Sequence, residues 1–152
     1  MSPLRPILVP LDFSASSDGA LEIAIALARR LDVEVVLLHV DSGVGTAPLG
    51  VEDVERRSRA RTELDRSKQA LESVSIPVRV LLRPGDPARE ILRVARSHSP
   101  GLIVLGTHGH SVATAPLLGS VADRVVRYAP FPVLVVPDPA RRPAQLIDGP
   151  AG

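Results

Sequence analysis

The sequence has 152 residues, a formal net charge of +1 and no cysteine, and its length fits one domain with a substantial core. The lack of cysteine excludes a disulfide framework and thiolate metal sites, and the near-neutral charge with only three aromatic side chains argues against a nucleic-acid partner. No apolar run approaches the ~20 residues of a membrane-spanning helix, and the N-terminal run is too short for a signal peptide, so we expect a cytoplasmic protein without membrane contact.

The first forty residues contain two predicted strands and one predicted helix. Ile7–Leu11 is a short apolar run typical of a strand buried on both faces, and Pro10, which lacks an N–H, is tolerated near its end. Asp12 stands at the carboxyl end of this strand. Ser17–Leu31 carries apolar residues at helical spacing, and a second apolar strand is predicted over Glu34–Val40.

His39, inside the second strand, is interpreted as a satisfied core histidine, with contact to a ligand as the less favoured alternative. Asp41–Gly50 is a loop by composition, and Val51–Ser73 is predicted as a long helix in which arginines and acidic residues interleave. Such patterning indicates a solvated face with i,i+4 ion pairs, here Asp53–Arg57 and Glu55–Arg59.

A third strand, a helix and a fourth strand follow. The strand is predicted over Val78–Leu82 and the helix over Ala88–Ser97, with Asp86 as its cap and Pro87 in its first turn. The fourth strand, Leu102–Leu105, is again wholly apolar.

The last third of the chain adds a helix over Ser120–Tyr128 and a fifth strand over Val133–Val136. Residues 138–152 are rich in Pro, Ala and Gly and show little apolar pattern. We therefore expect one domain over residues 1–137 and a poorly ordered tail over residues 138–152.

The alternation of strands and helices predicts an α/β fold, a doubly wound five-stranded parallel sheet with helices on both faces. Hydrophobic residues make up 45% of the chain and aromatic residues only 2%, so the core is expected to be aliphatic. In such sheets a ligand lies at the carboxyl ends of the strands, where the winding reverses. If the first and fourth strands are neighbours there, Asp12 faces Gly106 and Val40 lies alongside.

A glycine pattern, G-x2-G-x9-G-[ST], links the fourth strand to the last helix through Gly106, Gly109, Gly119 and Ser120. The start of that helix leaves unpaired N–H groups beside the positive end of the helix dipole, which is typical of a phosphate site. The spacing fits neither the Walker loop nor G-x-G-x-x-G. We interpret it as a phosphate or nucleotide site, the alternative being a connection that merely turns the chain.

In these features the sequence resembles the universal stress protein family, over nearly its whole length. The resemblance rests on five stretches, namely Ile7–Asp12, His39–Val40, Gly85–Pro87, Gly106–Val126 and Ala129–Pro137. The complete glycine pattern is the mark of the ATP-binding branch of that family. The resemblance implies the strand order 3-2-1-4-5 of a Rossmann-like, adenine nucleotide alpha hydrolase-like fold.

The resemblance also implies ATP, together with Mg²⁺, in the crevice. Val40 would contact adenine through its backbone and Asp12 would lie beside the adenosine, while the first two motif glycines would line ribose and phosphates. The implied binding residues are Pro10, Asp12, Val40, Gly106, Gly109, His110, Gly119, Ser120 and Val121. His110 stands where the family often has Arg or Lys, and it either faces phosphate or is an exposed residue without a role.

Three functions remain open: an ATP-binding regulatory module of the stress response, a slow ATP hydrolase, and a dimeric stress scaffold without nucleotide. The stretch between Gly106 and Gly119 has no lysine or arginine to clamp the phosphates, which favours binding over turnover and at most a weak ATPase with no assigned catalytic residue. The apolar last strand, Val133–Val136, predicts a homodimer through a sheet edge, unless the tail covers that edge.

Overall fold

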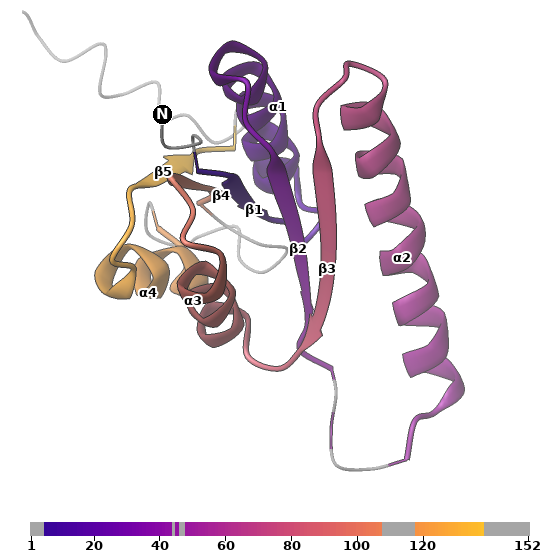
Figure 1. Cartoon of the computed structure of the whole chain (residues 1–152). Coiled ribbons are helices and arrows are strands. Elements are labelled where there is room, and N and C mark those ends of the chain that lie inside the picture. Colours follow the sequence, from indigo (N-terminus) through magenta and orange to yellow (C-terminus); the bar gives the residue numbers. More distant parts are fainter. Residues whose placement is uncertain (1–4, 44, 46–47, 108–117, 139–152) are drawn as a thin grey trace, which may run out of the picture.

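The structure is a computed structural model that describes residues 5–43, 45, 48–107 and 118–138. It contains a parallel sheet of five strands in the order β3-β2-β1-β4-β5, which confirms the predicted fold class and strand order (Figure 1). The elements in chain order are β1 Ile7–Pro10, α1 Ala15–Leu31, β2 Val35–Asp41, α2 Val51–Glu72, β3 Val78–Pro84, α3 Pro87–His98, β4 Leu102–Gly106, α4 Ser120–Tyr128 and β5 Val133–Val136.

Every predicted element is present, and no boundary differs from its prediction by more than two residues. The largest differences, of two residues each, are at the start of α1 and the end of β3. Ser14 caps α1, which begins at Ala15 rather than at Ser17, and β3 continues to Pro84 rather than ending at Leu82. The Ser14 hydroxyl accepts a hydrogen bond from the Ser17 N–H at 3.3 Å. The predicted cap of α3 is confirmed, since Asp86 Oδ2 accepts from the Arg89 N–H at 2.9 Å and Pro87 opens the helix.

Two apolar clusters cover the two faces of the sheet. Successive side chains of a strand alternate between them, so that Ile7 and Val9 lie on the α1 and α2 side and Leu8 lies on the α3 and α4 side. This double burial explains why the strands are almost wholly apolar. The buried hydrophobic residues among those described are Ala, Val, Leu and Ile, as the composition predicts.

The strand order brings the predicted site residues to one edge of the sheet. β1 lies between β2 and β4, with Ile7 level with both Val35 and Leu102. The carboxyl ends of β1, β2 and β4 therefore meet where the sheet changes its winding direction, the place where open α/β sheets bind ligands.

The two outermost strands are β3 and β5, which confirms that the last strand is an edge strand (Figure 1). Residues 139–152, nearly all of the predicted tail, lie outside the described residues, so the domain boundary at residue 137 stays a prediction.

Among the described residues, no helix is both long and apolar enough to cross a membrane.

Candidate functional site

A cleft of about 1200 Å³ opens among the described residues at the carboxyl ends of β1, β2 and β4. Seven of the predicted site residues line it together: Pro10, Asp12, Val40, Gly106, Gly119, Ser120 and Val121. The remaining two, Gly109 and His110, lie outside the described residues. The cleft is slightly larger than the roughly 300–1,000 Å³ of typical small-molecule sites, so it has room for a nucleotide.

The N-terminus of α4 opens into this cleft without a side-chain cap. Its N-cap residue is Gly119, whereas α1 and α3 are capped by the oxygens of Ser14 and Asp86. The N–H of Gly119 donates to the carbonyl of Thr107 at 2.6 Å, which closes the base of the connection from β4. The amides of Ser120, Val121 and Ala122 precede the first helical bond, which the Asp123 N–H makes to the Gly119 carbonyl at 2.9 Å, so these three amides have no acceptor within the helix and carry the positive end of its dipole.

Gly106 is required by packing as well as by its place in the cleft. A Cβ built on it would lie 2.7 Å from the carbonyl carbon of Ser16 and 2.8 Å from its Cβ, too close for real atoms. The missing side chain thus lets the first turn of α1 pack against the end of β4. The sequence predicted a phosphate or nucleotide site at this glycine but not its packing against α1.

Asp12 stabilises the turn into α1 and also lines the cleft. Its Oδ1 accepts hydrogen bonds from the Ser14 N–H at 3.0 Å and from the Ser14 hydroxyl at 2.5 Å, so it stabilises the turn into α1. The residue is also exposed and lines the cleft. A carboxylate can accept several hydrogen bonds, so the turn and a ligand can both use it.

Asp41, at the end of β2, joins that strand to α2, and this connection was not predicted. Its Oδ1 accepts from Arg56 Nε at 3.0 Å and its Oδ2 from Arg57 Nε at 3.1 Å, while the Gly43 N–H donates to Oδ1 at 3.1 Å. The expected Asp53–Arg57 pair is therefore wrong: Arg57 turns to Asp41, and Asp53 lies 2.9 Å from Arg56 Nη2 instead. Arg57 thus pairs with the more buried of the two carboxylates, since Asp41 is buried and Asp53 is half-buried.

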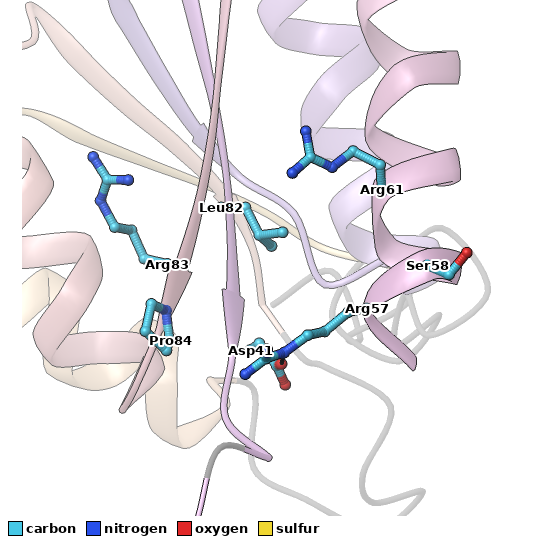
Figure 2. A pocket seen from close by; sticks show the side chains of 7 residues that line it. All are labelled: Asp41, Arg57, Ser58, Arg61, Leu82, Arg83 and Pro84. Atoms are coloured by element: carbon cyan, nitrogen blue, oxygen red, sulfur yellow. Dashed lines mark hydrogen bonds and ion pairs between the residues drawn. The ribbon is translucent and has the colours of Figure 1, made fainter. Parts of the chain in front are cut away.

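Figure 2 shows Arg57 reaching from α2 to Asp41. These two residues, with Arg61 and Leu82, line a hollow of about 490 Å³ between α2 and β3. Arg61 points toward β3 on the side of Leu82, and Arg83 lies on the other side of that strand. The arginines of this helix face are thus directed at the sheet, not only at solvent.

Two opposing effects act on the pKa of Asp41. Burial would raise the pKa, but the hydrogen bonds from Arg56, Arg57 and the Gly43 amide outweigh it and hold the pKa below its ordinary value. Because the folded-state pKa is the lower one, the ionised carboxylate stabilises the fold above the unfolded-state pKa, and this stabilisation is lost as the pH falls through the folded-state value.

We expect Asp41→Asn to lower the free energy of unfolding by about 2 kcal/mol at pH 7, because charge-assisted bonds from two arginines are lost. The difference from wild type should begin to shrink as the pH falls through about 4, where the unfolded chain takes up the proton, and should be lost once the pH falls through the lower folded-state pKa of Asp41. Urea unfolding across this pH range measures the difference, with Glu55→Gln, an exposed position on the same helix, as the control. An equal difference at pH 7 and pH 3 would contradict the assignment.

Several cleft residues were missed or assigned another role, among them Phe13, His39, Arg56 and Arg59. The signal for the arginines is present in the sequence, since Arg56, Arg59, Ala60 and Glu63 recur at the spacing of one helix face and all line the cleft. A helix that follows a parallel strand begins at the carboxyl edge of the sheet, so its first turns lie beside the site. The histidine is satisfied, as predicted, but half-buried in the cleft wall.

Comparison with known proteins identifies the family. The sequence model of the universal stress protein family matches residues 3–137. The chain belongs to this family. Universal stress protein MJ0577 of Methanocaldococcus jannaschii is 30% identical over 152 residues, covering 87% of this chain and 94% of that protein. Universal stress protein YxiE of Bacillus subtilis is 32% identical over 143 residues, covering 86% and 97%.

Solved structures of universal stress proteins share the fold. The structure of MJ0577 matches with a TM-score of 0.76, 30% identity and coverage of 89% of this chain and 96% of that chain. A universal stress protein from Archaeoglobus fulgidus, solved in complex with dAMP, matches with a TM-score of 0.68, 26% identity and coverage of 88% and 98%. Nucleotide binding therefore occurs within the universal stress protein family.

Proposed function

We propose that this universal stress protein binds ATP in the cleft and acts as a regulatory module of the stress response, whose nucleotide state alters its partners. The observation that carries the proposal is the N-terminus of α4, which opens into the cleft with a glycine as its cap. Backbone amides at such a helix start are a general anion site and suit a phosphate chain. The related protein solved with dAMP supports an adenine nucleotide as the ligand.

The other described residues of the cleft fit the nucleoside part of ATP. Val40 offers its backbone at the end of β2, and Asp12 offers an exposed carboxylate after β1. Ser120, exposed at the first position of α4, would add its hydroxyl to the amides that hold the phosphates. Of the two arginines on the described cleft wall, Arg56 is already paired with Asp41, so we expect moderate affinity that depends mainly on backbone donors.

Mg²⁺ would be held mainly by the phosphates. The part of the chain that the structure describes has no group of three His, Asp or Glu side chains that could hold a metal ion alone. Magnesium keeps several waters and commonly takes few protein ligands beside phosphate oxygens, so this donor set is compatible with it as a companion of the nucleotide. Its contribution would be to neutralise phosphate charge.

Isothermal titration calorimetry with ATP and Mg²⁺ tests the proposal. We expect saturable binding of one ATP per chain and a rise in the unfolding temperature with ATP concentration, because a ligand that binds only the folded state stabilises it. Nucleotide released by heating the purified protein should contain adenine. The proposal is contradicted if there is no binding heat, no change in unfolding temperature and no released nucleotide.

We further propose a homodimer that forms through the edge strand Val133–Val136. The strand is apolar, and Leu134 at its centre is 37% exposed. Val126 and Tyr128 of α4, a helix that contacts β5, are exposed as well. An uncovered apolar edge strand readily pairs with another chain.

Leu134→Lys is expected to convert the dimer to a monomer, because a charged side chain on an edge strand opposes pairing. Val74→Lys is a matched control, since Val74 is 38% exposed and follows α2, away from this edge. Sedimentation at equal concentrations distinguishes the outcomes. A wild type that is monomeric, or a Leu134→Lys variant that stays dimeric, would overturn this interface.

A further inference from the structure

The ring of His39 contacts the residues on both sides of Asp12. His39 Nδ1 lies 2.7 Å from the carbonyl oxygen of Leu11, the residue before Asp12. The same ring stacks on Phe13, the residue after it, with the ring centroids 4.7 Å apart and the planes inclined by 28°. A single side chain from β2 therefore contacts the backbone before this carboxylate and the side chain of the residue after it.

The hydrogen bond to Leu11 shows which ring nitrogen of His39 acts as the donor. A carbonyl oxygen can only accept, so Nδ1 must carry the hydrogen. The N–H of Leu11 in turn donates to the carbonyl of Leu38 at 2.8 Å. Leu11 follows the last residue of β1, and both its N–H and its carbonyl are thus hydrogen-bonded to β2. These bonds fix the backbone position from which the turn at Asp12 begins.

Phe13 needs this support because its backbone is strained. Its φ of 64° lies in the left-handed region, which a bulky residue without special support rarely adopts. Such conformations persist where the surroundings hold them, and they concentrate at functional sites. Here the stack on His39 holds the Phe13 ring, and the bonds from Ser14 to Asp12 Oδ1 hold the backbone.

We propose that His39 is a positioning residue that sets the direction in which Asp12 presents its carboxylate to the ligand. The inference rests on the proposed function, in which Asp12 offers its carboxylate to the nucleoside part of ATP. His39 is then not only a core residue, because it acts on the ligand through Asp12 without touching the ligand itself.

Amide hydrogen exchange in the ligand-free protein tests the positioning directly. The Ser14 N–H donates to Asp12 Oδ1, so its exchange rate reports whether the carboxylate holds its place. We expect this exchange to be at least about tenfold faster in His39→Phe, which keeps a ring but removes the donor to Leu11. His98→Phe is the control, because His98 Nδ1 likewise lies 3.0 Å from a backbone carbonyl, that of Val94, on α3.

ATP affinity tests the consequence for the ligand. We expect Asp12→Asn and His39→Phe each to weaken binding about tenfold, and the double variant to be within about twofold of either single variant, because both changes remove the same contact. A purely structural role would lower the unfolding temperature and leave ATP affinity well below that temperature unchanged, or give additive losses. If His39→Phe does not fold, His39→Leu, which also removes the Nδ1 donor to Leu11, replaces it with the same expected results.

The two failures can be told apart. Unchanged Ser14 exchange in His39→Phe overturns the positioning role, whether or not ATP binds. If Ser14 exchange is faster in His39→Phe but the wild type binds no ATP, the proposed nucleotide function fails. The role of His39 in holding Asp12 would still stand. Faster exchange with additive losses of affinity would show that His39 does not act on the ligand through Asp12.

Discussion

Replacing Ser120 by Asp is expected to weaken ATP binding about 30- to 100-fold without destabilising the fold. Ser120 is the exposed first residue of α4, so a carboxylate there would lie beside the first-turn amides that we assign to the phosphates. Repulsion between a carboxylate and a phosphate about 4 Å apart falls between roughly 1 and 4 kcal/mol, depending on exposure. The same charge interacts favourably with the helix dipole, so the free energy of unfolding should stay level or rise slightly.

Ser120→Asn provides the matched control, because asparagine has the shape of aspartate without its charge. We expect it to cost less than about fivefold in ATP affinity, the effect of one lost neutral hydrogen bond. Calorimetry measures affinity and urea unfolding measures stability for both variants. Equal affinities of Ser120→Asp and wild type would mean that the phosphates bind elsewhere.

Gly106→Ala is expected to lower the free energy of unfolding by about 3 kcal/mol, the upper part of the usual range for overpacking. The added methyl group would overlap the backbone of Ser16, which belongs to the first turn of α1 and has little freedom to move. Displacement of this turn would also disturb Ser14 and Asp12, so ATP affinity should fall together with stability.

Gly19→Ala is the control for this substitution. Gly19 lies inside α1, and a Cβ there would meet Val136 Cγ1 at an ordinary distance of 3.6 Å. Alanine is favoured over glycine in a helix by about 1 kcal/mol, so this variant should be more stable than wild type. If Gly106→Ala lowers the free energy of unfolding and Gly19→Ala raises it, the loss at Gly106 comes from the close contact and not from replacing a glycine as such. Changes of the same sign in both variants would refute the close contact at Gly106.

Patterns within single elements predicted the fold well. The apolar runs at Ile7–Leu11 and Leu102–Leu105 are short and have no polar alternation, because helices cover both faces of the sheet. The residues at the carboxyl ends of β1, β2 and β4 could therefore be assigned to one site. Seven of the nine predicted residues line the cleft, and the other two lie outside the described residues.

Contacts between elements could not be predicted in the same way. The bonds of Asp41 to Arg56 and Arg57 depend on how α2 lies against β2, and residue spacing within α2 carries no information about that. The hydrogen bond of His39 to Leu11 and its stacking on Phe13 likewise depend on the course of the backbone after β1. Sequence patterns specify which face a side chain occupies, but its partner on that face is determined by packing.

The account depends most on backbone amides at the start of α4 as the phosphate site. Solution NMR of the ¹⁵N-labelled protein during titration with ATP and Mg²⁺ follows these amides individually. We predict that the amide signals of Ser120 and Val121 shift the most and saturate together, with smaller changes near Val40. Signals at the start of α4 that stay unmoved at saturating ATP would contradict the account.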